Sequence, residues 1–226
     1  MRPARSRRTD GVMTQQARPS LPHWMIALIL VCCVIEAGLW LAPMLGYGGV
    51  RVAVNLAGGF WSPLLWRGGG LYPGQPVLMF VTYGLLHGGL AHLAMNMFSL
   101  AAVGRELARF LRPLPMLAVY LVSQIAAGVL FALISPAPGP MVGASGAIFG
   151  LAGALIGQAI KWRRSRRMSM RPIWRAVLII GGLNIALTLL VPQIAWQAHL
   201  GGIIAGFVMG LLLPLKRDRF GARALR

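Results

Sequence analysis

The sequence places one serine, Ser145, where its hydroxyl could act as a nucleophile. It stands in the motif Gly143-x-Ser145-Gly146, at the start of an apolar and glycine-rich run. Glycine on both sides leaves the hydroxyl approachable, and the free N–H groups and dipole of a helix N-terminus could hold a developing oxyanion. A serine here could also simply cap the helix, which requires no catalytic function.

A histidine, His199, could be the base for this serine, because both residues begin glycine-rich runs. The first run carries Gly146 and Gly150, and the second carries Gly202 and Gly206. Glycines four residues apart let helix backbones approach closely, so we expect the two runs to pack against each other. Ser145 and His199 would then meet at similar depth as nucleophile and base. The alternatives are a structural histidine or a member of a proton relay.

Carboxylates are too few to complete a catalytic triad. The chain has four acidic residues, namely Asp10, Glu36, Glu106 and Asp218. The first and last lie in basic tails, Glu106 ends an apolar run, and Glu36 lies within one. We therefore expect a dyad without a carboxylate. Phe149, one turn after Ser145, could pack against the His199 ring, or could be an ordinary core aromatic.

A second polar group stands earlier in the chain, in the motif His87-x4-His92-x3-Asn96. His92 and Asn96 are four residues apart, so they share a helix face, and both can donate hydrogen bonds to an oxyanion. Two histidines five apart without a nearby carboxylate or thiolate make a poor metal site. Hydrogen bonding between helices is the other interpretation of Asn96. Further polar residues within the apolar runs include Asn184.

The composition is that of a membrane protein. Hydrophobic residues make up 57% of the 226 residues and charged residues 12%, with 29 glycines in addition and a mean hydropathy of +0.70. Soluble domains have about twice this share of charged residues. A disordered chain, a collagen and an ordinary soluble domain are excluded. The adjacent Cys32 and Cys33 have neither zinc-site spacing nor a disulfide framework.

Six apolar runs predict an all-α integral membrane protein with six transmembrane helices, since a spanning helix needs about 20 mostly apolar residues. The runs are 24–45, 90–108, 114–134, 144–160, 173–191 and 196–213. We expect a transmembrane domain at 24–214 between two basic cytoplasmic tails, 1–23 and 215–226. The first run is too long for a cleaved signal peptide and lacks a convincing cleavage site, so it is taken as the first helix.

Positive charge alternates between the gaps of these runs. The 22 lysine and arginine residues divide into five in the N-terminal tail, two after the first run, three after the second, seven after the fourth and five in the C-terminal tail. The positive-inside rule therefore places both termini in the cytoplasm. These basic residues are interpreted as topology determinants that also touch anionic lipid, and nucleic-acid binding is not expected.

The long gap 46–86 lies on the outer side in this topology. It is rich in glycine, proline and aromatic residues, and aromatic residues favour the headgroup level. We expect a membrane-embedded outer loop with a half-buried helical piece at 56–65. An ordinary extracellular loop is the alternative.

Taken in order, three motifs resemble those of the rhomboid intramembrane serine proteases. They are His87-x4-His92-x3-Asn96, Gly143-x-Ser145-Gly146 and Ala198-His199-x2-Gly202-x3-Gly206, and Gly104-x-Glu106 is also similar to the family pattern. The resemblance spans about 24–213. It implies a six-helix rhomboid-like bundle that cleaves transmembrane segments of membrane proteins.

The resemblance also implies roles for individual residues. Ser145 would be the nucleophile and His199 the general base, while His92, Asn96 and the Ser145 N–H would form the oxyanion hole. His87 would line a water-filled cavity at the site. The fifth helix and a cap over the site would control substrate access. The pair Trp66-Arg67 departs from the family pattern, because the run Gly68-Gly69-Gly70 and two prolines separate it from His87.

No metal or nucleotide motif is present, so no metal or cofactor is expected. The expected partners are transmembrane protein substrates and the lipid bilayer, and the expected location is a bacterial inner membrane. The sequence leaves the oligomeric state open. The main alternative is a non-catalytic rhomboid-like protein that binds transmembrane helices. A proton-coupled transporter is less favoured, since the chain lacks clear internal repeats.

Overall fold

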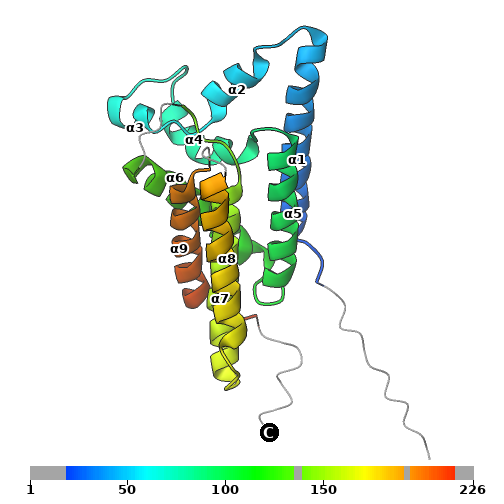
Figure 1. Cartoon of the computed structure of the whole chain (residues 1–226), viewed down its shortest axis with the longest axis vertical. Helices are drawn as coiled ribbons and strands as arrows, with labels where there is room; N and C mark the ends of the chain where they lie inside the picture. The colour runs from blue at the N-terminus through cyan, green and yellow to red at the C-terminus, as the bar shows by residue number, and fades with distance from the viewer. Residues whose placement is uncertain (1–18, 135–138, 191–193, 217–226) are drawn as a thin grey trace, which may run out of the picture.

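The computed structural model describes residues 19–134, 139–190 and 194–216, and in this part of the chain the protein is helical without β-strands. The elements, in chain order, are α1 (His23–Leu41), η1 (Ala42–Leu45), α2 (Val50–Gly58), α3 (Pro63–Arg67), α4 (Gln75–Thr82), η2 (Tyr83–Leu85), α5 (Leu90–Leu107), α6 (Pro113–Ile134), α7 (Ser145–Ser165), α8 (Arg171–Leu190) and α9 (Trp196–Leu212). The long helices stand side by side, and α2, α3 and α4 gather at one end of them (Figure 1). The all-α prediction is confirmed for these residues.

The long helices follow the predicted apolar runs closely. The clearest difference is α7, which continues to Ser165 although its apolar run ends near residue 160. Lysine and arginine are good helix formers, so the helix continues past the apolar stretch. Hydropathy reports where lipid contact is favourable rather than where a helix ends.

Length and composition mark several described helices as candidate membrane spans. Residues His23–Leu45, α6 and α8 qualify on their own, with mean hydropathies of 2.5, 2.3 and 1.9. The helical stretches Gln75–Leu85 and Leu90–Leu107 qualify as a pair bent by 83°, and α9 is a shorter apolar helix.

The core of the fold is the contact between α7 and α9, which depends on glycine. A side-chain carbon added at Gly202 would collide with the carbonyl oxygen of Gly146, and one added at Gly206 would collide with that of Gly150. Such close backbone contact gains dispersion energy that larger side chains would prevent. Much of α7 is buried, and its buried apolar residues join a core cluster with residues of α1, α5 and α6.

Both ends of the described chain lie at the same end of the bundle, away from α2, α3 and α4 (Figure 1). Near the start, the Trp24 indole N–H donates to the carbonyl of Pro113 at 3.1 Å. Near the finish, the Lys216 backbone N–H donates to the carbonyl of Phe110 at 2.7 Å. The turn between α5 and α6 therefore holds both ends. Most of the two predicted basic tails, 1–18 and 217–226, lies outside the described residues.

The expected single helical piece at 56–65 is wrong, because two short helices occupy this region with a break between them. Gly59 is extended (φ −72°, ψ 157°), and a side chain there would meet Pro140. Phe60 then exchanges two backbone hydrogen bonds with Met141, of 2.8 and 2.9 Å, and its ring is fully buried. This bridge ties the outer segment to the loop that leads into Ser145.

The glycine contact between α7 and α9 predicts a sharp position dependence of stability. Gly206→Ala should lower the free energy of unfolding by about 1–3 kcal/mol, since overpacking forces the backbones apart. Gly182→Ala, in α8, is the matched control because a side-chain carbon there meets nothing within 4 Å. Thermal unfolding in detergent micelles measures both. Equal melting temperatures for the two variants would contradict the packing described.

Candidate active site

Ser145 and His199 are within hydrogen-bond distance of each other. Ser145 is the first residue of α7, and His199 lies in the first turn of α9. The His199 Nε2 and Ser145 Oγ atoms are 2.9 Å apart, and the His199 side chain is buried. A neutral imidazole with its proton on Nδ1 can accept the serine proton at Nε2, which is the geometry of a nucleophile and its base.

Two further side chains contact the His199 ring. The Phe149 ring is stacked on it, with centroids 4.3 Å apart and planes 12° from parallel. At the edge of the same ring, Asn184 Oδ1 lies 2.7 Å from His199 Nδ1. The amide oxygen is an acceptor, so Nδ1 carries the proton and donates it in a hydrogen bond. Sequence reasoning noted Asn184 as a polar residue but did not connect it with the histidine.

His92 presents an N–H toward the segment before Ser145. The Gly88 backbone N–H donates to His92 Nδ1 at 3.1 Å, so in the neutral ring the proton is on Nε2. A side-chain carbon at Gly143 would lie 3.1 Å from that Nε2 and 3.8 Å from Ser145 Oγ. Gly143 also has φ +127°, a conformation that other residues rarely adopt. Gly143 therefore lies close to both the His92 ring and the serine hydroxyl.

Asn96 and His87 are the other members of this polar cluster. Asn96 is buried, and its Nδ2 donates to the His92 carbonyl at 2.9 Å, which leaves a second amide hydrogen. The His87 ring is buried and lies edge-on to the His92 ring, with centroids 5.3 Å apart. Within the described residues neither His87 ring nitrogen has a hydrogen-bond partner, so this part of the site is polar enough to bind water.

Glu36, the acidic residue within the first apolar run, has a charged partner. It is buried in α1 and forms a bidentate ion pair with Arg51 of α2, with N–O distances of 2.8 and 3.1 Å. Arg51 also donates to the His87 carbonyl at 3.2 Å. The hydrogen bond to Glu36 raises the pKa of Arg51, so this guanidinium remains charged. The ion pair thus links the outer helix α2, α1 and the loop that carries His87.

The pair Trp66-Arg67 lies outside this polar cluster. Trp66 and Arg67 end α3, and the Trp66 side chain is largely exposed. Among the described residues, no group of three or more His, Cys, Asp or Glu side chains could hold a metal ion.

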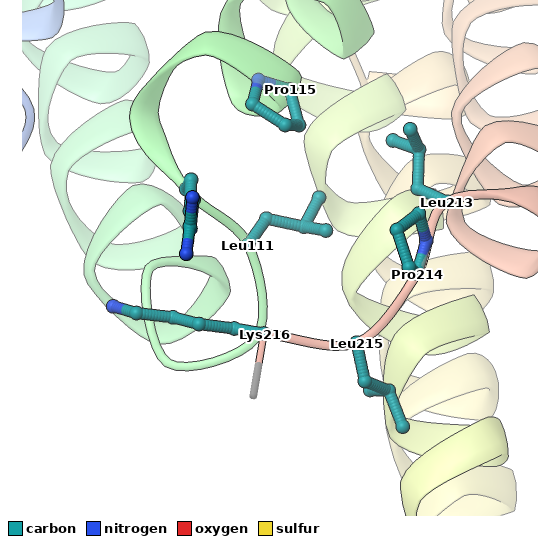
Figure 2. Close-up of a pocket in the computed structure, with 7 residues that line it drawn as sticks. Leu111, Pro115, Leu213, Pro214, Leu215 and Lys216 are labelled. Carbon is teal, nitrogen blue, oxygen red and sulfur yellow. The ribbon is translucent and has the colours of Figure 1, made fainter. Parts of the chain in front are cut away.

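A cavity of about 300 Å³ lies at the far end of α9 from His199. Figure 2 shows its lining residues, which come from the α5–α6 turn, the start of α6 and the segment after α9. They are Leu111, Arg112, Pro115, Leu213, Pro214, Leu215 and Lys216. The cavity is therefore separate from the serine and histidine.

Comparison with known proteins identifies the family of this chain. A family model described as the Rhomboid domain matches residues 74–216. The chain belongs to the rhomboid family, and it is an integral, multi-pass membrane protein. The match includes every residue of the serine, histidine and asparagine cluster.

Individual relatives cover most of this chain but less of their own length. Rhomboid protease GluP of Bacillus subtilis is 32% identical over 223 residues, which are 97% of this chain and 40% of that protein. RHOMBOID-like protein 5 of Arabidopsis thaliana is 36% identical over 138 residues, 60% of this chain and 43% of the relative. This chain thus spans less than half the length of these relatives.

The ion pair of buried Glu36 with partly exposed Arg51 predicts a strong effect on stability when the carboxylate is removed. Glu36→Gln should lower the free energy of unfolding by about 3 kcal/mol, because it leaves Arg51 without its counter-charge. Glu106→Gln is the matched control, since Glu106 pairs with Arg109 at 3.1 Å on an exposed surface. Exposed pairs contribute about 0–1 kcal/mol. Chemical or thermal unfolding in micelles compares the two, and similar losses in both variants would refute the structural weight given to Glu36.

Proposed function

We propose that the chain is an intramembrane serine endopeptidase that cleaves transmembrane segments of membrane proteins with a Ser145–His199 dyad. The observation that carries this proposal is the 2.9 Å distance between His199 Nε2 and Ser145 Oγ. Membership of the rhomboid family and the similarity to Rhomboid protease GluP support it.

In the proposed reaction His199 Nε2 takes the hydroxyl proton as Ser145 Oγ attacks the scissile carbonyl carbon. The tetrahedral intermediate collapses when the imidazolium returns the proton to the leaving amine, which leaves an acyl-enzyme ester. A water molecule, deprotonated by the same imidazole, then attacks the ester, and the imidazolium returns this proton to Ser145 Oγ as the acid product leaves. Each proton is accounted for by His199, so the dyad needs no metal.

The developing oxyanion needs donors aimed at the serine. His92 Nε2–H faces Gly143, next to the nucleophile, and Asn96 retains one amide hydrogen. The first N–H groups of α7 have no partner within the helix, and they point toward its N-terminal end. We assign His92, Asn96 and the Ser145 N–H to the oxyanion hole, and we propose that His87 lines a water-filled cavity beside them.

We further propose that residues 24–214 form six spans of a bacterial inner membrane, with both termini in the cytoplasm. The hydrogen bonds that hold both chain ends at the α5–α6 turn support an even number of spans. The basic gaps support the orientation. A helical substrate keeps its carbonyls in its own hydrogen bonds, so segments with small or helix-breaking residues should be preferred.

Replacing either member of the dyad tests the proposal. Ser145→Ala and His199→Ala should each lower cleavage of a labelled single-span substrate in liposomes by on the order of 10³-fold or more. Ser165→Ala and His23→Ala are matched controls, since both residues are exposed and far along the chain from the dyad. Cleavage at the wild-type rate by Ser145→Ala would contradict the assignment of Ser145 as the nucleophile. Helix capture without cleavage or serine labelling in the wild type would favour the binding alternative.

The oxyanion assignment predicts a separate kinetic signature. His92→Phe keeps a ring beside His87 but removes the N–H, so kcat should fall on the order of 10²-fold with little change in KM. Met95→Ala is the control, because the Met95 side chain is exposed on the same helix. Steady-state kinetics in liposomes, with a melting curve for each variant, provide the measurement. An unchanged kcat in a folded His92→Phe protein would exclude His92 as an oxyanion donor.

A further inference from the structure

The side chain of Asn184 contacts the edge of the imidazole opposite Ser145. Its Oδ1 lies 2.7 Å from His199 Nδ1, while His199 Nε2 lies 2.9 Å from Ser145 Oγ. We infer that Asn184 is a positioning residue, which fixes the tautomer and the orientation of His199 so that the Nε2 lone pair faces the nucleophile. This inference rests on the proposed proteolytic function and adds a third, uncharged member to the dyad.

The stacked phenylalanine alone does not supply this orientation. Phe149 holds the plane of the His199 ring, with 12° between the two planes. A ring rotated by 180° about its Cβ–Cγ bond keeps the same plane and stacks equally well, yet it would present carbon atoms to Ser145 and to Asn184. The hydrogen bond to Asn184 distinguishes the two orientations, and it also keeps the proton on Nδ1. The two contacts therefore restrain different motions of the base.

Carboxylates of the described residues are committed elsewhere. Glu36 is paired with Arg51 through two hydrogen bonds. Glu106 is paired with Arg109 on the surface. An amide can accept the Nδ1–H bond without placing a charge inside an apolar span, where a carboxylate is expensive. Asn184 is thus a suitable acceptor for this position.

The helix that carries Asn184, α8, is the long helix whose side chains are least buried within the protein. In α8 no side chain that the structure describes is buried, and Asn184 itself is half-buried. The Thr188 hydroxyl bonds to the Asn184 backbone carbonyl and leaves the amide side chain free for the histidine. The orientation of the base therefore depends on where α8 sits against α9, and a displacement of α8 removes the acceptor from His199.

Two nearly isosteric variants test the role of the acceptor oxygen. Asn184→Leu removes this oxygen and should lower kcat about 10- to 100-fold, while KM stays within about twofold of the wild-type value. The loss is a part of the rate enhancement that a general base supplies. Asn184→Asp retains an acceptor oxygen, so its kcat should be at least about tenfold higher than that of Asn184→Leu. Thr188→Val is the matched control on the next turn of α8 and should retain the wild-type kcat. All are measured in liposomes on one labelled single-span substrate.

Several outcomes would overturn the inference. They are a wild-type kcat in Asn184→Leu, an equal loss in the Leu and Asp variants, or a loss expressed in KM alone. The ¹⁵N NMR signals of histidine-labelled protein give a readout without proteolysis, with the His199 signal assigned by its absence in His199→Ala. The Nδ1–H form should dominate in the wild type and mix with the Nε2–H form in Asn184→Leu. If the wild type neither cleaves nor labels at Ser145, the proteolytic proposal fails, whereas an unchanged tautomer ratio in Asn184→Leu refutes the positioning role by itself.

Discussion

The site depends on one constraint, the close backbone contact between α7 and α9. Gly146 and Gly150 meet Gly202 and Gly206 with no room for a side-chain carbon. Because Ser145 begins α7 and His199 lies in the first turn of α9, the separation of these helices sets the distance between hydroxyl and imidazole. A hydrogen bond weakens within a few tenths of an ångström of its optimum, so the glycines decide whether the two groups can exchange a proton.

Features with a local pattern could be predicted from the sequence. The apolar runs, the glycine spacing and the one-turn relation of Phe149 to Ser145 each follow from a periodicity of a few residues. The all-α fold and the family were predicted correctly, and most helix boundaries differ by only a few residues. The end of α7 and the break at Gly59 were not predicted. In both cases contacts outside the apolar pattern, or the helix propensity of charged residues, determine the local structure.

Pairings between separate segments could not be predicted. Asn184 and His199 belong to different helices and share no local pattern, so the sequence identifies two polar residues without showing that they touch. The sequence places Glu36 within an apolar run without showing its partner, because Arg51 is 15 residues away in the outer segment. Each pair satisfies one buried polar side chain, Glu36 or His199, and this requirement is visible only once the helices are packed.

The paired charges have a consequence for the proposed chemistry. Arg51 is neutralised by Glu36, and the groups around Ser145 are the imidazoles of His87, His92 and His199, two amides and backbone N–H groups, none of which carries a permanent charge. Charge then arises only during the reaction, as an oxyanion and an imidazolium that form together and attract each other at low dielectric. Fixed dipoles such as the Asn184 amide stabilise this pair without the penalty of a permanent buried charge. A bilayer-embedded hydrolase is therefore better served by a neutral acceptor on its histidine than by the carboxylate that water-exposed enzymes use.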